Sequence, residues 1–115
     1  MKIKILLMII LPLLANAGLT KSELIEVQNM LNQSFAQKGI AHKAMNVYAY
    51  NDADGKTLVF VYRGKMVDAG TRTAEQIKNN MFTGMTQEDI DAYKSWGYSR
   101  VKVVVLKGHS YYYLR

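Results

Sequence analysis

Residues 45–63 have the sequence MNVYAYNDADGKTLVFVYR, and this stretch decides the fold. Residues 45–50 and 57–63 are rich in β-branched and aromatic side chains, which predicts two strands. Between them, residues 51–55 supply the Asn, Asp and Gly of a tight turn, and Gly55 is free to adopt a positive φ. The stretch therefore predicts a β-hairpin.

A helix is predicted before this hairpin, over residues 21–38. Thr20 and Glu23 have the spacing of a capping box, in which each side chain bonds a backbone N–H of the other residue. Apolar residues then recur at helical spacing, which indicates one buried face. Gly39 is a natural end point, because glycine tolerates the left-handed conformation that follows a last turn.

Two shorter helices are predicted after the hairpin, beyond a connection at residues 64–72. Thr73 begins the first, over residues 74–82, with Gln76 as its capping partner. Thr86 begins the second, over residues 87–96, because threonine is a preferred residue at the start of a helix. Ile77 and Met81 form the apolar stripe of the first helix, and Ile90 and Tyr93 face inward from the second.

A second hairpin is predicted at the C-terminal end. Residues 99–107 form the strongest predicted strand, Gly108 and His109 a turn, and residues 110–114 a last strand. The resulting order of elements is α-β-β-α-α-β-β. We therefore predict an α+β fold in a single small domain, with an antiparallel sheet of about four strands and helices packed on one face.

The two helix–hairpin halves have some internal similarity. Setting Gly39 against Gly97 also matches Phe35 with Tyr93. The matches are few, and a glycine between a helix and a strand is common in unrelated sequences. Duplication and coincidence therefore both remain as explanations.

Residues 1–17 have the pattern of a cleavable signal peptide. An apolar run over residues 5–14 is followed by Ala15 and Ala17, the small residues that signal peptidase accepts. This run is roughly half the ~20 residues that a membrane-spanning helix needs, so no stable membrane anchor is expected. We expect a periplasmic or secreted bacterial protein whose mature domain is residues 18–115.

The composition limits the chemistry of this domain. The chain has no cysteine, which excludes disulfides and a lipid-bearing cysteine. Its formal net charge of +6 falls to +4 when Lys2 and Lys4 leave with the signal. The remaining basic residues are scattered, so no nucleic acid is expected as a partner. An anionic envelope polymer is the alternative that this charge allows.

No cofactor or metal is expected. Residues 52–55 resemble part of a calcium loop, but Tyr50 and Val61 stand where that loop needs ligands. A hairpin turn explains the stretch better. His42 and His109 are the only histidines, and two distant histidines without cysteine make a poor metal site.

Acidic residues gather at the start of the last predicted helix. Glu88, Asp89 and Asp91 fall in its first turns, where the helix dipole favours negative charge. A catalytic pair of carboxyl groups would need two environments that separate their pKa values. Stabilisation of the helix start is the better explanation, and no catalytic residue is assigned.

Tyrosine is unusually frequent, with eight in the chain. Cross-strand aromatic pairing explains most of them simply, and an amphipathic contact surface is the functional alternative. Basic residues lie close to them on the predicted strands. The predicted partner-binding residues are Tyr48, Tyr50, Tyr62, Arg63, Arg100, Lys102, Tyr111 and Tyr113.

Residues 84–90, GMTQEDI, resemble the Gly-Met-Thr helix start of small outer-membrane assembly lipoproteins of the SmpA/BamE type. That resemblance implies a cysteine anchor after the signal, which this chain does not have. The helix-then-hairpin order is also similar to that of small periplasmic PepSY-type modules. No functional residue is carried over from either family.

These observations favour a small exported binding protein that is not an enzyme. It would dock a sheet face or edge onto another envelope or secreted protein, as an inhibitor or an immunity protein does. The alternative is a polyanion or glycan binder of the cell envelope. A small hydrolase using His109 or the acidic cluster is the third hypothesis, for which the required set of roles cannot be filled.

Overall fold

The predicted order of elements is confirmed over residues 18–115, the part of the chain that the computed structural model describes. The helices are α2 (Lys21–Gln37), α3 (Lys65–Asp68), α4 (Ala74–Thr83) and α5 (Gln87–Ser95). The strands are β1 (Asn46–Asn51), β2 (Thr57–Arg63), β3 (Arg100–Val105) and β4 (Gly108–Tyr113). The one-turn helix α3 lies within the stretch predicted as a connection.

The structure does not test the predicted export signal. The signal itself, with Ala15 and Ala17 at its end, lies outside the described residues. Within residues 18–115, no helix has the length and apolar character needed to span a bilayer.

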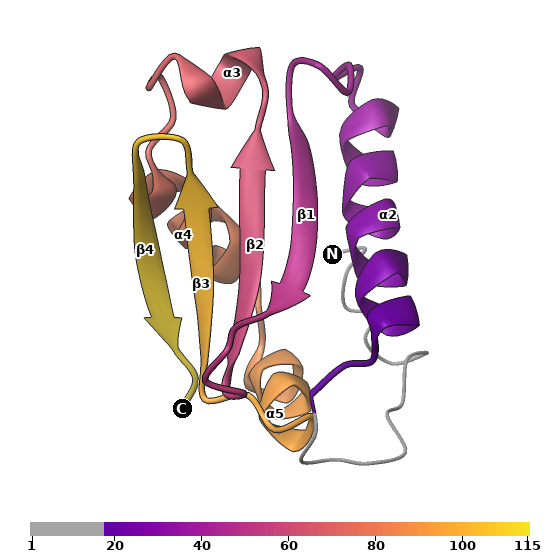
Figure 1. Cartoon of the computed structure of the whole chain (residues 1–115), viewed down its shortest axis with the longest axis vertical. Coiled ribbons are helices and arrows are strands. Elements are labelled where there is room, and N and C mark those ends of the chain that lie inside the picture. The colour runs from indigo at the N-terminus through magenta and orange to yellow at the C-terminus, as the bar shows by residue number, and fades with distance from the viewer. Residues whose placement is uncertain (1–17) are drawn as a thin grey trace.

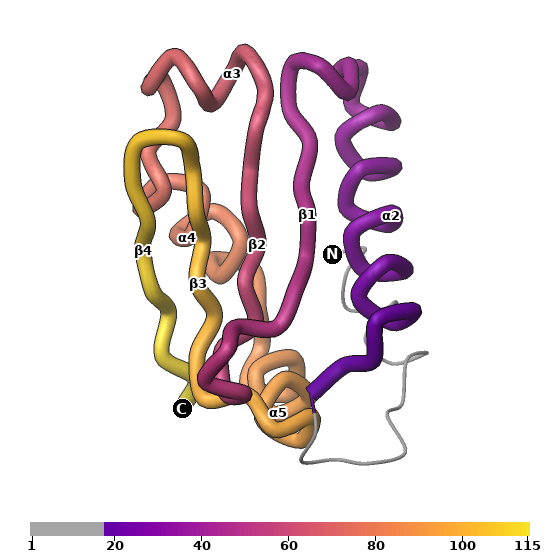
Figure 2. Tube along the Cα trace, in the orientation of Figure 1, coloured from indigo at the N-terminus to yellow at the C-terminus, as the bar shows by residue number. Residues whose placement is uncertain are grey.

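The four strands lie side by side in chain order, β1-β2-β3-β4 (Figures 1 and 2). Each hairpin is antiparallel, but β2 and β3 run parallel. The expected antiparallel sheet is therefore wrong at its centre, and the sheet is mixed. Parallel neighbours need a crossover connection, and α4, behind the sheet, and α5, at its lower end, form part of it between β2 and β3 (Figure 1).

This parallel pair also bears on the suggested internal repeat. Since β2 is antiparallel to β1 and parallel to β3, β1 and β3 point in opposite directions. The first strands of the two hairpins are thus not equivalent by translation along the sheet. The two halves of the domain are not a simple tandem copy of one arrangement.

The helices bury one face of the sheet, as predicted. Leu58, Phe60, Val101 and Val103 project from β2 and β3 into this core and are completely buried. Each such side chain contributes about 1.5–3 kcal/mol by leaving water. The helices supply Leu24, Val27, Leu31, Ile77, Met81, Phe82, Ile90 and Tyr93 to the same cluster.

Three helices begin with a reciprocal capping box. In each, a threonine side chain accepts from the backbone N–H three residues on, whose side chain accepts from the backbone N–H of the threonine. Asp89 is the partner of Thr86 and is buried, so its carboxylate serves the start of α5. The pairs are Thr20–Glu23, Thr73–Gln76 and Thr86–Asp89.

The turn of the second hairpin lies earlier than predicted. Val105 pairs with Gly108, so the turn is formed by Leu106 and Lys107, and His109 belongs to β4. The observed and predicted registers differ by an even number of residues, so both place the same side chains on the same face. The alternating pattern therefore could not distinguish them, and Gly108 was wrongly assigned to the turn.

The first described residues, Gly18 and Leu19, are hydrogen-bonded to the rest of the domain. Gly18 donates its backbone N–H to the Trp96 carbonyl at 2.8 Å, and Leu19 is buried. The Tyr98 hydroxyl accepts from the Leu19 N–H at 2.9 Å and donates to Asn51 at 2.5 Å. Burial raises the pKa of Tyr98 to about 12, so this hydroxyl keeps its proton at physiological pH. Gly18 and Leu19 are thus tied to the segment that follows α5 and to the end of β1.

Candidate functional site

The sheet has a second face that no described helix covers, and we call it the open face. Successive residues of a strand point to opposite faces, so the residues that alternate with the core define it. Figure 1 shows this face toward the viewer, with α4 behind the sheet and α5 at its lower end. Its members are Tyr48, Tyr50, Val59, Val61, Arg63, Arg100, Lys102, Val104, His109, Tyr111 and Tyr113.

The open face has valines at its centre, of which Val59 is completely buried by its neighbours, and aromatic rings at two borders. Two rows cross all four strands, Tyr50–Val59–Lys102–Tyr111 and Tyr48–Val61–Val104–His109. The valines lie on β2 and β3, and the aromatic rings lie on the outer strands. Tyr48 is 53% exposed and Tyr113 is 56% exposed. Tyr48, Tyr50 and Tyr113 are therefore exposed at the surface, and Tyr111 is half-buried.

The prediction that Tyr62 is a binding residue is wrong. Tyr62 lies on the buried face and is 3% exposed, with its hydroxyl bonded to the Met81 sulfur at 3.2 Å. It shares this face with Phe60 because both alternate with the open-face residues of β2. All the other predicted binding residues lie on the open face.

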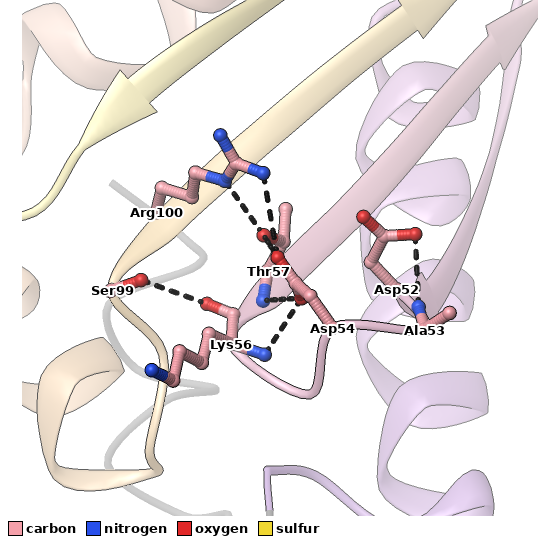
Figure 3. Close-up of polar contacts among 7 residues, drawn as sticks. All are labelled: Asp52, Ala53, Asp54, Lys56, Thr57, Ser99 and Arg100. Atoms are coloured by element: carbon pink, nitrogen blue, oxygen red, sulfur yellow. Dashed lines mark hydrogen bonds and ion pairs between the residues drawn. The ribbon is translucent and has the colours of Figure 1, made fainter.

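Arg100 is held in place by the turn of the first hairpin (Figure 3). Its Nε donates to the Thr57 hydroxyl at 2.8 Å, and its Nη2 lies 3.4 Å from an Asp54 carboxylate oxygen. The Asp54 carboxylate also accepts the backbone N–H groups of Lys56 and Thr57. The hydrogen bond from the Lys56 N–H is the main cause that lowers the pKa of Asp54, so this carboxylate stays ionised.

This network joins the two hairpins at the end of the sheet. Asp54 belongs to the β1–β2 turn, and Arg100 begins β3. Because donors occupy both carboxylate oxygens of Asp54, the turn explanation of residues 52–55 accounts for the acidic pattern. No group of three metal-ligating side chains occurs within residues 18–115.

The Tyr111 ring is the centre of a cationic and aromatic cluster. The Arg100 guanidinium carbon lies 4.2 Å from the ring centroid, and the Lys102 ammonium lies 5.5 Å from it. The rings of His109 and Tyr113 stand 5.5 and 6.2 Å away. Both cations are within the range of cation–π attraction, so the cluster is positively charged around an aromatic surface.

Ion pairing leaves the open face with a positive balance. Arg63 pairs with Asp68 of α3 at 3.0 Å, and Arg100 pairs with Asp54. Lys102 forms no ion pair with any residue in the described range 18–115. Since no carboxylate belongs to the rows of the open face, its uncompensated charge is positive.

The outer edge of β1 is covered by side chains of α2. Asn32 accepts from the Val47 N–H at 2.9 Å and donates to the Val47 carbonyl at 3.1 Å. Gln28, one helical turn earlier, accepts from the Ala49 N–H at 3.0 Å. The backbone groups that an added strand would need are therefore already occupied at this edge.

The outer edge of β4 is free. Leu114 donates its N–H to the Ser99 carbonyl at 3.0 Å, which makes them a hydrogen-bonded pair of the ladder. Such pairs recur at every second residue, so Tyr112 and Ser110 also direct their backbones toward β3. His109, Tyr111 and Tyr113 direct theirs away from it. No hydrogen bond to these outward groups occurs among residues 18–115.

The structure does not assemble a hydrolytic site from the candidate residues. His109 points to the open face, whereas Ser110 points to the helix-covered face and bonds Glu75 at 2.5 Å. Neighbouring residues of a strand cannot act as a nucleophile–base pair across the sheet. Asp89 is occupied at the helix start, and His42 lies in the loop before β1.

Several residues of the site were missed in the sequence. Val59, Val61 and Val104 lie at the centre of the open face, but valine in a strand is typical of a core position, so the sequence did not mark them. His109 was assigned to a turn, although its alternation with Tyr111 places it on the same face. Gln28 and Asn32 have helical spacing but nothing in their sequence identifies the strand edge they bond. Comparison of the chain with protein-family models, with curated proteins and with solved structures found no match.

Proposed function

We propose that this is a non-enzymatic binding protein that docks another envelope or secreted protein against the open face and the free edge of β4. The unequal treatment of the two sheet edges carries this proposal. Side chains of α2 satisfy the β1 edge, whereas the β4 edge keeps its donors and acceptors available beside an aromatic surface. A free edge accepts an added strand through backbone hydrogen bonds.

The chemistry of the open face favours an acidic partner segment. Tyrosine and arginine are enriched at the energetic centres of protein interfaces. Lys102 and Arg100 lie on β3, over the Tyr111 ring of the edge strand β4, and the rows of the open face contain no carboxylate. An extended segment carrying Asp or Glu would gain both ladder bonds and charge pairing. Inhibitors and immunity proteins act by docking of this kind.

A pair of substitutions at one position tests this proposal. The purified protein is immobilised and exposed to the envelope fraction of the producing cells. His109→Pro removes an outward N–H without removing a bond to β3, and His109→Ala removes only the imidazole. We expect a stoichiometric partner that His109→Ala retains and His109→Pro loses. Equal capture by both variants, or no stoichiometric partner under several growth conditions, would contradict the proposal.

Binding to an anionic polymer is the second candidate function. The observation that favours it is the proximity of both Arg100 and Lys102 to the Tyr111 ring. Polyglutamate and dextran sulfate are suitable probes. Binding that weakens steeply with salt and is lost in Lys102→Glu would support this candidate. Salt-independent binding, or none, would remove it.

A further inference from the structure

A pocket opens on the other side of the sheet, between α2 and α4. α2 packs on β1, whereas α4 packs on β3 and β4, so a gap remains between the two helices, with Tyr62 of β2 in its wall. The pocket that results has a volume of about 310 Å³. This value is at the lower end of the range of small-ligand sites, which is roughly 300–1,000 Å³.

The walls of this pocket are apolar. They are formed by Leu31, Phe35, Met45, Tyr62, Ile77 and Met81. The Tyr62 hydroxyl already donates to the Met81 sulfur, so the polar atom in the wall is occupied. The Phe35 ring contacts that of Tyr62, with centroids 6.2 Å apart. Methionine side chains adapt their shape readily, which suits a flexible hydrocarbon.

The rim of the pocket is positively charged. Lys38 follows α2 and Arg72 precedes α4, and both are exposed. Neither forms an ion pair with a residue of the described range 18–115. No Asp or Glu lines the pocket. An anionic group at this rim would therefore find two uncompensated cations.

A polar hollow of about 510 Å³ adjoins the pocket and shares Arg72 and Asn80 with it. Its other residues are Thr71, Gln76 and Asn79, which offer hydrogen bonds but no opposing charge. An apolar pocket therefore borders a cationic and hydrogen-bonding surface. This is the division that a molecule with a hydrocarbon body and an anionic head requires.

We propose that this pocket binds a single-chain anionic amphiphile. The hydrocarbon chain lies among Phe35, Met45 and Met81, and a carboxylate or phosphate head lies at Lys38 and Arg72. The site lies on the helix-covered side of the sheet, so it does not depend on docking at the open face. The small volume selects a short or medium chain over a two-chain lipid.

Calorimetric titration of the purified protein tests the proposal with four ten-carbon probes: decanoate, decyl phosphate, decanol and decyltrimethylammonium. Decanoate and decyl phosphate should bind at one site, and their ratio tells a carboxylate head from a phosphate head. Decanol should bind at least tenfold more weakly, and the cation not at all. Equal binding of all four, or no binding of either anion below its micelle concentration, would overturn the proposal.

Variants separate the two halves of the site. K38Q combined with R72Q should weaken decanoate binding at least tenfold, and K43Q, at an exposed lysine outside the pocket, should not. S34W should fill the pocket from its rim without removing a core side chain. The Met45 and Met81 methyl resonances should shift with decanoate, and that of Met30 should not. Unchanged affinity in the double variant, or in a folded S34W, would contradict the assignment.

Discussion

The two outer strands, β1 and β4, present similar side chains but different edges. Each carries two tyrosines on the open face, Tyr48 and Tyr50 on β1 and Tyr111 and Tyr113 on β4. The outward backbone of β1 is bonded by Asn32 and Gln28 of α2, whereas that of β4 has no bonding partner among residues 18–115. The comparison shows that one edge contributes to stability and the other remains accessible.

Proline substitutions on β4 should have the largest effect on the unfolding free energy, and the loss should depend on whether the replaced N–H points toward β3 or away from it. Ser110→Pro removes an N–H that points to β3 and leaves a buried carbonyl unpaired, which should cost at least about 2–3 kcal/mol of unfolding free energy. His109→Pro removes an outward N–H and should cost about 1 kcal/mol or less. Urea denaturation of both variants measures the difference. Equal losses would mean that the β4 edge is not free.

Truncation of the side chain that bonds β1 should have the next largest effect. Asn32→Ala leaves both the N–H and the C=O of Val47 without a partner, so we expect a loss of about 2 kcal/mol. Asn29→Ala, at an exposed position of the same helix, is the control and should change stability by less than about 0.5 kcal/mol. Similar values for the two variants would show that α2 does not stabilise the β1 edge.

Acid should loosen the attachment of both hairpins. Hydrogen bonds from Lys56 and Thr57 lower the pKa of Asp54, and the Ser110 hydroxyl and Lys78 lower that of Glu75. A lowered pKa means that the stabilisation is present above the unfolded-state value, near 4, and is lost as the pH falls through the folded-state value. The melting temperature should therefore decrease when the pH is lowered below about 4, and Asp54→Asn should make this decrease smaller. An unchanged acid profile in the variant would contradict the assignment.

Substitution of a border tyrosine should have the smallest effect on stability. Tyr113 is exposed on the open face, so Tyr113→Thr should change the unfolding free energy by no more than about 0.5 kcal/mol. Tyr112→Thr, one residue earlier, loses a ring that stacks on Phe82 at 3.9 Å and should cost clearly more. A large loss in Tyr113→Thr would show that the open-face tyrosines serve packing instead of contact.

Local chemistry made most of the elements predictable from the sequence. Threonines at the helix starts and residues 51–55 at the first turn specify structure through contacts within a few positions. The parallel pairing of β2 with β3 depends on how α4 and α5 return the chain, which no local pattern encodes. The register of β4 was ambiguous because a shift by an even number of residues preserves every face.

The site was predictable where alternation alone decides it. Tyr48 and Tyr50 share a face by their spacing, as do Tyr111 and Tyr113. Tyr62 was assigned to the surface because composition does not tell which face of a strand the helices cover. The covered edge of β1 could not be predicted either, since Gln28 and Asn32 bond a strand well separated from them in sequence.

Amide hydrogen exchange in the free protein tests the central claim most directly. The account predicts that the amides of His109, Tyr111 and Tyr113 exchange on the order of tenfold or more faster than those of Val47 and Ala49. Only the second group donates to side chains of α2. Protection of the β4 amides equal to that of Val47 and Ala49 would contradict a free edge, and with it the proposed docking surface.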